Sequence, residues 1–273
     1  MPPPRRFAGV LADGRVPWRA RAELALAEAR RRLRPAETYR LHYGGGSLFL
    51  SHEDYEIDSE TLKNTLVDEP YLADYRGAVV LDLGAHKGTF GAYALAHGAA
   101  AVVSYEPEAR NVALLARSAA TFTEAGRSWR VVKAAVSAAA GEAELHVMRS
   151  SWGHTLHPPD SWAPHETGLE RVPVLAMADV LRDAVAAADA EARLLVKINT
   201  EGEECETVLG TPVESWDAVD ELIVETHPWT TCTAEDLANH LASAGLTRVV
   251  SRHERLLQLR REPPRSDRRS DPT

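Results

Sequence analysis

The first part of the sequence that could do chemistry is an apolar strand that ends in an acid and a glycine turn. Val80-Leu81-Asp82-Leu83 leads into Gly84-Ala85-His86-Lys87-Gly88, where two glycines bracket the turn. Glycine lets the backbone bend sharply and a ligand come close, and the helix expected after the turn begins with unpaired N–H groups. We therefore expect a ligand here, with a cationic group facing the acid. The expected contact residues are Asp82, Gly84, Ala85, His86 and Gly88.

A second acid stands at the end of the next expected strand, in Tyr105-Glu106-Pro107. A carboxylate at the tip of a second neighbouring strand can accept hydrogen bonds from both hydroxyls of a ribose. Each such charge-assisted hydrogen bond contributes roughly 1.5–3 kcal/mol. The glycine turn and Glu106 together predict a ligand that contains a ribose.

Two classes of ligand use this arrangement. A nicotinamide dinucleotide needs Gly-x-Gly-x-x-Gly, in which three glycines approach the pyrophosphate. Here the spacing is Gly-x-x-x-Gly, and Asp82 before the turn would repel a pyrophosphate but suits the amino group of a methionine. S-adenosylmethionine (SAM) also carries a sulfonium cation, which suits an acidic chain. The sequence therefore predicts a SAM-dependent methyltransferase. The alternative, a nicotinamide oxidoreductase, lacks its third glycine here.

Three segments together resemble the FkbM family of methyltransferases: residues 80–88, 105–107 and 196–203. At these places typical members read Asp-Val-Gly-Ala-Asn-x-Gly, Phe-Glu-Pro and Lys-Ile-Asp-Val-Glu-Gly-Ala-Glu, in the same order. The resemblance covers roughly residues 68–251. It implies a Rossmann-like class I methyltransferase sheet flanked by helices. It also implies O-methylation of a hydroxyl on a small natural product or sugar.

The resemblance suggests further cofactor contacts and shows two departures. Ala134 and Ala135 follow the third expected strand, where the family reads Asn-x-Ala-x-Ser or similar, and we expect them to hold the adenine. His86 stands where the family has Asn, and Asn199 where it has Asp. We expect Asn199 beside the cofactor, but an amide cannot act as a general base, and a metal site there is less expected.

Three residues are candidates for the catalytic step: His227, Glu225 and Glu201. The C-terminal tips of strands line the ligand crevice in doubly wound sheets, and His227 lies two residues past Glu225 at such a tip. His227 is the first candidate for a general base, which would add ~10²–10⁴-fold to the rate. A turn histidine before Pro228 is an equally good interpretation. Glu225 would orient His227 or bind acceptor hydroxyls. Glu201 is a candidate because it matches a position of the family motif.

The elements that position these residues alternate between strand and helix. Strands are predicted over 78–83, 101–105, 129–132, 143–147, 193–198, 221–225, 248–251 and 255–260, and helices over 89–96, 108–123, from near Gly202, and over 234–244. Such alternation indicates βαβ units and a mainly parallel sheet. Ahead of it, the pattern predicts a helix over 17–34, a hairpin over 39–51 and a short helix over 59–66 capped by Asp58 or Ser59.

These patterns divide the chain into an N-terminal extension (1–67), a methyltransferase domain (68–261) and a disordered tail (262–273). We expect the extension and the residues just after it to cap the site. The candidate capping residues are Tyr55, Glu56, Thr65 and Tyr71.

One long segment, 148–171, shows no regular pattern. A loop of this length in a compact domain is usually functional or disordered, and we expect it to cover the substrate. Its histidines, His154, His157 and His165, match no compact zinc site, so no metal is expected.

The chain carries a formal net charge of −9, and its Arg-rich ends leave the centre more acidic still. Phosphate binding needs a basic surface, so nucleic acid is not an expected partner. No apolar run approaches the ~20 residues of a membrane helix, and no signal peptide is recognisable. We therefore expect a cytoplasmic protein. Cys205 and Cys232 are too few for a disulfide framework and suggest buried small apolar residues rather than nucleophiles.

Two alternatives stay open at this point. The acceptor could be a small amine, which would make the reaction an N-methylation. The chain could also be a module that binds SAM or a nucleotide without catalysis, which the change to Asn199 would allow. The sequence fixes neither the acceptor nor the oligomeric state, and a homodimer is possible.

Overall fold

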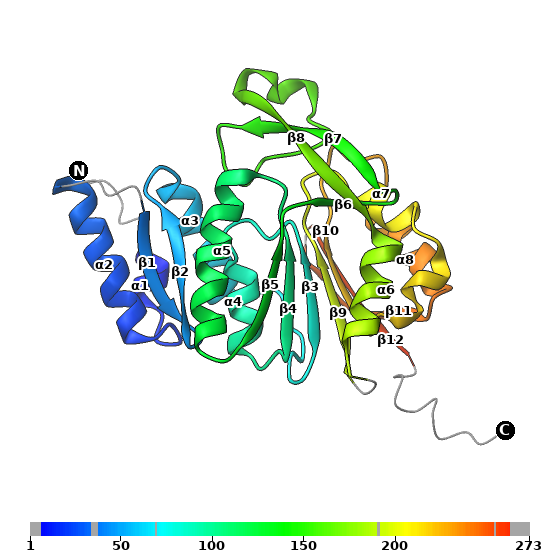
Figure 1. The fold of residues 1–273 in the computed structure, drawn as a ribbon, viewed down its shortest axis with the longest axis horizontal. Helices are drawn as coiled ribbons and strands as arrows, with labels where there is room; N and C mark the ends of the chain where they lie inside the picture. The colour runs from blue at the N-terminus through cyan, green and yellow to red at the C-terminus, as the bar shows by residue number, and fades with distance from the viewer. Residues whose placement is uncertain (1–6, 34–37, 69, 190–191, 254, 263–273) are drawn as a thin grey trace.

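The computed structural model describes residues 7–33, 38–68, 70–189, 192–253 and 255–262. A seven-stranded sheet forms its centre, in the order β11-β12-β10-β9-β3-β4-β5 (Figure 1). The strands are β3 (Val79–Leu83), β4 (Ala101–Tyr105), β5 (Ser128–Val132), β9 (Leu194–Ile198), β10 (Glu221–Glu225), β11 (Leu246–His253) and β12 (Leu256–Arg261). Neighbours from β5 to β10 run parallel, and β12 pairs antiparallel with β10 and β11. The predicted Rossmann-like sheet is confirmed.

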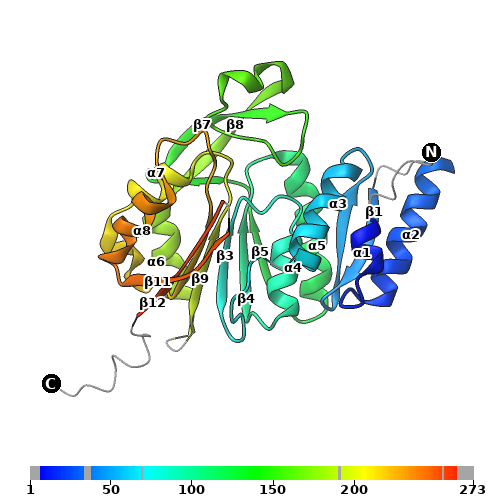
Figure 2. The same ribbon diagram turned by 180° about the vertical axis from the view of Figure 1, so that it is seen from behind.

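The sheet is covered on both faces by helices, which explains its apolar strands. α4 (Thr89–Ala96) and α5 (Ala109–Glu124) lie on one side, and α6 (Met177–Ala187), α7 (Glu204–Leu209) and α8 (Ala234–Ala242) lie on the other (Figures 1 and 2). A short 3₁₀ helix, η3 (Val213–Ala218), precedes β10. On β3, Val80 packs into one core while Leu81 and Leu83 pack into the other. From β3 the chain proceeds outward to β5 and later returns to β9, so the strand order reverses between β3 and β9.

The N-terminal part packs against α5. It comprises α1 (Ala8–Ala12), α2 (Trp18–Leu33), β1 (Thr38–Tyr43), β2 (Gly46–Ser51), α3 (Tyr55–Lys63) and a π-helical turn, η1 (Asn64–Asp68). The backbone N–H groups of Ser47 and Phe49 donate to hydroxyls of α5. A Cβ on Gly46 would lie 2.5 Å from Phe122, so glycine allows this close approach. The predicted hairpin is confirmed, and α2 matches its predicted helix within the described residues. Residues 1–6 lie outside them.

The short helix predicted over 59–66 begins earlier, at Tyr55. Asp58 and Ser59 are therefore interior helix residues, and the prediction that one of them caps the helix is wrong. The reason is a tertiary contact: the Asp58 carboxylate points inward and pairs with the buried ammonium group of Lys87.

A small sheet lies over one end of the central sheet, at the top of Figure 1. Its order is β6-β8-β7, with β6 (Ala135–Ser137), β7 (Gly141–Met148) and β8 (Glu166–Ala176). β8 and the 3₁₀ helix η2 (Asp160–His165) occupy much of the segment predicted to be irregular, so that prediction is wrong beyond residue 159. β8 is largely exposed and is held by its antiparallel ladder with β7. The strand was therefore not recognisable in the sequence from a regular alternation of buried and exposed residues.

Cys205 in α7 and Cys232 ahead of α8 form a disulfide. The expectation of buried small residues holds for Cys205, but the bond between the two cysteines was not expected. Their separation of 27 residues carried no local sign of pairing, because the bond depends on how α7 and the segment after β10 meet. Within the described ranges, no helix combines the length and apolar character needed to cross a membrane.

Candidate active site

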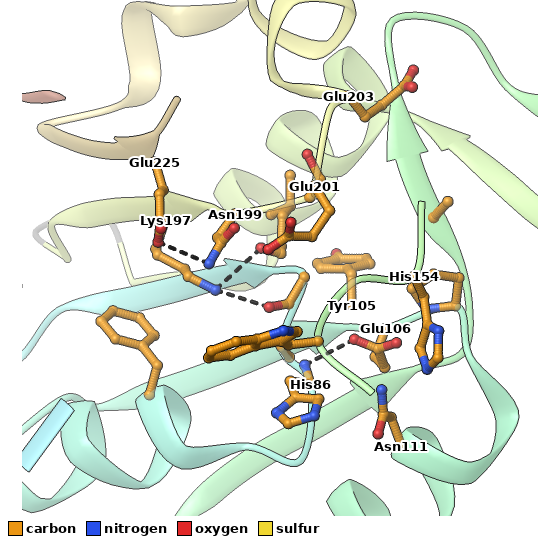
Figure 3. A pocket seen from close by; sticks show the side chains of 18 of the residues that line it. His86, Tyr105, Glu106, Asn111, His154, Lys197, Asn199, Glu201, Glu203 and Glu225 are labelled. Carbon is orange, nitrogen blue, oxygen red and sulfur yellow. Dashed lines mark hydrogen bonds between the residues drawn. The ribbon is translucent and has the colours of Figure 1, made fainter. Parts of the chain in front are cut away.

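A pocket opens at the carboxyl ends of β3, β4, β9 and β10, beneath the small sheet (Figure 3). It lies at the point where the strand order reverses, which is where ligands bind in open α/β sheets. Nine of the twelve predicted site residues line it: Gly84, Ala85, His86, Glu106, Ala134, Ala135, Asn199, Glu201 and Glu225. The other three, Asp82, Gly88 and His227, lie behind this lining.

Asp82 faces a cation of the chain itself. Its Oδ1 lies 3.0 Å from Nζ of Lys197, and the carboxylate is fully buried. Nζ of Lys197 also donates to the carbonyl oxygen of Gly84 at 2.9 Å. Lys197 thus lies beside Asp82 at the place where the sequence predicts a ligand's cationic group. Lys197 itself lines the pocket and was missed, although it stands in the family motif.

The two glycines of the turn have different tasks. Gly84 has φ +72°, and a Cβ there would lie 1.7 Å from the carbonyl oxygen of Asn199, so no other residue fits. Gly88 has φ +92°, and a Cβ at this position would clash with Leu115 and Trp129. Gly84 therefore allows the tips of β3 and β9 to touch at the pocket, whereas Gly88 lets α4 pack closely onto the core and is not in the pocket lining.

Glu106 is buried at the tip of β4, where the sequence places a ribose-binding acid. Its Oε2 accepts the backbone N–H of His86 at 2.8 Å, and its Oε1 accepts that of Glu108 at 3.1 Å (Figure 3). Burial raises the pKa of Glu106 to about 7, although these two N–H groups lower it. A carboxylate oxygen accepts more than one hydrogen bond, so Glu106 can also accept from ligand hydroxyls.

Residues 149–159, here called the lid, run from β7 towards η2 and contact the glycine turn through one serine. Oγ of Ser151 lies 3.0 Å from Nε2 of His86, and the Ser151 carbonyl accepts the side-chain N–H of Asn111 at 3.0 Å. Burial lowers the pKa of His86 well below its usual value, so the ring is neutral. Ser151, Trp152 and His154 line the pocket, so the lid lies where a covering loop is predicted.

The other two loop histidines are placed elsewhere. His157 pairs with Glu203 at 2.9 Å, and His165 does not line the pocket. Across the part of the chain that the structure describes, no group of three or more His, Cys, Asp or Glu side chains could hold a metal ion.

The N-terminal part and the segment just after it supply one wall of the pocket, through Thr61, Asn64, Thr65 and Tyr71. Thr65 and Tyr71 were candidate capping residues. The other two candidates are not in the lining: the Tyr55 hydroxyl donates to Glu28, and Glu56 is exposed. The wall includes the π-helical turn, and such turns occur often at functional sites. Thr61 and Asn64 were missed because the direction in which their side chains point depends on how α3 and η1 pack against the rest of the fold.

His227 is enclosed by two carboxylates. Its Nδ1 lies 3.1 Å from Glu204 and its Nε2 lies 3.4 Å from Glu201. Burial alone would lower the pKa of His227, but hydrogen bonds to Glu201 and Glu204 outweigh it and raise the pKa to about 10. The imidazole is then a cation at neutral pH, with no lone pair for a proton. An imidazolium offers no free base, so this environment favours another residue than His227 as the general base.

Glu204 was missed by sequence reasoning and shapes this corner. Its carboxylate accepts the backbone N–H groups of Thr200 at 2.8 Å and Gly202 at 3.0 Å. It thereby fixes the turn that carries Glu201, whose φ of +55° is left-handed. One buried acid thus holds both the turn and the imidazolium.

Glu225 ends β10 and faces the pocket. Its Oε2 accepts the side-chain N–H of Asn199 at 2.9 Å (Figure 3). Burial raises the pKa of Glu225, and the charge of Glu201 adds to this, whereas His227 and Lys197 lower it. Of the three predicted catalytic residues, Glu201 and Glu225 line the pocket as carboxylates that can accept a proton.

The sequence matches no family model and no curated protein. Similar solved structures are methyltransferases. Methyltransferase FkbM from Methylobacillus flagellatus KT is 16% identical over 85% of this chain and 56% of its own, with a TM-score of 0.42. A SAM-dependent methyltransferase from Agrobacterium tumefaciens is 12% identical over 77% and 58%, with a TM-score of 0.38.

Magnesium protoporphyrin IX methyltransferase from Synechocystis PCC 6803, solved with bound SAM, is 12% identical over 94% of this chain and 90% of its own, with a TM-score of 0.34. The chain thus spans little more than half of the first two structures.

Proposed function

We propose that the chain is a SAM-dependent methyltransferase that methylates a hydroxyl group of a small natural product or sugar. The observation that supports this best is the order of groups along one pocket. The glycine turn and Lys197 stand at its centre, Glu106 towards one side, and Glu225 with Asn199 towards the other. This order suits a donor that spans the strand tips and an acceptor at the far end.

The residues present fit SAM by their chemistry. Ala134, Ala135 and Val136 offer an apolar surface to an adenine ring, and Glu106 offers buried acceptor oxygens to ribose hydroxyls. Carboxylates outnumber cations in the lining, which suits a ligand with a net positive charge. We assign the methionine end to the turn at Gly84, Ala85 and His86. Bound SAM would supply a methyl group already activated by its sulfonium.

The chain's own residues then position the acceptor and take its proton. A hydroxyl loses its proton as its oxygen is methylated, and we assign that proton to a carboxylate oxygen of Glu225. Positioning can supply effective molarities of ~10⁵ M, and a general base adds about 10²–10⁴-fold. Glu201 stays paired with the His227 cation, and the lid excludes water.

The test is calorimetric titration of the protein with SAM, S-adenosylhomocysteine and NAD⁺ in parallel. Binding of the first two without the third is expected and would justify a screen of hydroxyl acceptors. Binding of NAD⁺ alone would overturn the proposal. Tight SAM binding with no turnover across a broad acceptor panel would favour a non-catalytic module.

An amine acceptor is the second candidate. The observation that favours it is the pair of carboxylates, Glu201 and Glu225, in the lining, since both accept N–H donors. The pH profile separates the two, because an amine must lose its own proton before attack. A rate that keeps rising with pH towards the acceptor's own pKa would indicate N-methylation.

A further inference from the structure

Asn199 and Glu225 hydrogen-bond across the tips of two neighbouring parallel strands. Val224 of β10 pairs with Ile198 of β9, so the residues that follow lie side by side. Nδ2 of Asn199 lies 2.9 Å from Oε2 of Glu225, and both side chains line the pocket. The backbone of Asn199 is fixed independently: its N–H donates to the carbonyl oxygen of Leu83 at 3.0 Å. The position from which the Asn199 side chain extends is therefore fixed by the backbone.

The orientation of the Asn199 amide is set by Glu225. Oδ1 of Asn199 is buried, and it has no hydrogen-bond partner among the residues that the structure describes. Only the N–H end can face an ionised carboxylate, because two oxygens without a proton between them repel each other. A change from Asn to Asp at this position would thus alter one known side-chain contact and leave the shape almost unchanged.

Charged groups of both signs face Glu225, and one of the cations, Lys197, is also paired with Asp82. The cations that face it are Lys197 of β9 and His227 of the segment after β10. The anions are Glu201 of the turn after β9 and Glu204 of α7. The Tyr71 hydroxyl, from the segment after the π-helical turn, faces it as well, and its own pKa is raised by burial and by the charge of Glu225. One more anion at hydrogen-bond distance would favour protonation of Glu225.

We propose that Asn199 is a positioning residue that holds Glu225 ionised and aimed, so that Glu225 can take the acceptor's proton. This rests on the proposed methyl transfer. With an Asp at this position, the two neighbouring carboxylates would share a proton, and Glu225 would be a weaker base near neutral pH.

The experiment measures the pKa of Glu225 directly, by ¹³C NMR of protein labelled at the glutamate carboxyls. Glu225→Gln identifies the resonance. Asn199→Asp is expected to raise the pKa of Glu225 by about one unit or more. Asn64→Asp is the matched control, since Asn64 lines the same pocket without a hydrogen bond to Glu225. It adds the same charge and is expected to shift the pKa by less than half as much.

Equal shifts in the two variants, or no shift in Asn199→Asp, would overturn the role of Asn199. If Asn199→Asp does not fold, Asn199→Leu removes the N–H donor without a charge and should also raise the pKa. Adenosylhomocysteine titration separates this inference from the proposed function. If the parent protein does not bind it, the methyltransferase proposal fails whatever the pKa; if it binds and the pKa is unmoved, only the Asn199 inference fails.

Discussion

Lys87 and Asp58 form an ion pair in the interior of the molecule. Nζ of Lys87 lies 2.6 Å from Oδ1 of Asp58, and each side chain is 1% exposed. A second acid, Asp54, lies 2.8 Å from the same Nζ, and Oγ of Ser151 lies 3.3 Å away. Burial raises the pKa of Asp58 to about 6, although Lys87 lowers it. One ammonium group thus ties the N-terminal part, the glycine turn and the lid together.

Lys87→Met is expected to lower the free energy of unfolding by about 3–5 kcal/mol, because it leaves buried carboxylates without a counter-charge. Lys63→Met is the matched control: Lys63 pairs with Asp68 at the same 2.6 Å, but both side chains are about half exposed. An exposed pair contributes at most about 1 kcal/mol. Urea unfolding measures both, and equal losses would contradict the importance of burial.

Glu106→Ala is expected to weaken the binding of adenosylhomocysteine by more than about tenfold, since charge-assisted hydrogen bonds to the ribose would be lost. Glu142→Ala serves as the control, because Glu142 lies in β7 and pairs with Arg171 away from the pocket. Calorimetry measures both. An unchanged affinity for Glu106→Ala would contradict the placement of the ribose.

The same residue predicts a pH dependence of binding. The pKa of Glu106 is about 7 without ligand, so part of the population is protonated near neutral pH. The ionised form is the better acceptor for two hydroxyls. We expect the affinity for adenosylhomocysteine to rise as the pH increases through about 7, and Glu106→Gln to abolish this rise. An affinity that falls over that range would exclude the assigned role.

Much of this architecture could be predicted from local patterns. β3, β4 and β10 are short apolar runs bounded by turns, and the predicted bounds of β4 and β10 match the structure. α6 was not predicted, although Met177, Val180, Leu181 and Ala184 are buried at helical spacing. β8 was harder to predict from the sequence, because it is largely exposed and is held by its antiparallel pairing with β7.

The site shows the same division between local and tertiary information. The glycine turn, Glu106 and Glu225 could be located because each lies at the end of a strand that the sequence pattern predicts. The charge of His227 could not, because it depends on Glu201 and Glu204, which another element brings to the ring. The pairing of Asp82 with Lys197 was hidden for the same reason, since the two residues are neighbours only through the β3–β9 pairing.

The cation at His227 predicts how stability depends on pH. The pKa of a histidine is about 6.5 in an unfolded chain, and that of His227 is raised to about 10 in the fold. A group with a raised folded pKa stabilises fully below its unfolded pKa and loses the contribution as the pH rises through the folded one. The stability difference between the parent and His227→Gln should therefore shrink from about pH 6.5 to 10, by up to about 5 kcal/mol. Urea unfolding across this range measures it, and a difference that grows with pH would restore a neutral imidazole as the base.

The disulfide predicts a dependence of stability on redox conditions. Cys205 follows Glu204 directly, and Cys232 lies five residues past His227, so the bond closes a 27-residue separation around the site corner. A loop of this size stabilises by about 3 kcal/mol in the chain-entropy view. A dithiol reductant should lower the unfolding free energy of the parent by about that amount and leave Cys205→Ser unaffected. If the reductant leaves the parent unchanged while alkylation and mass spectrometry show free thiols, the bond contributes no stability.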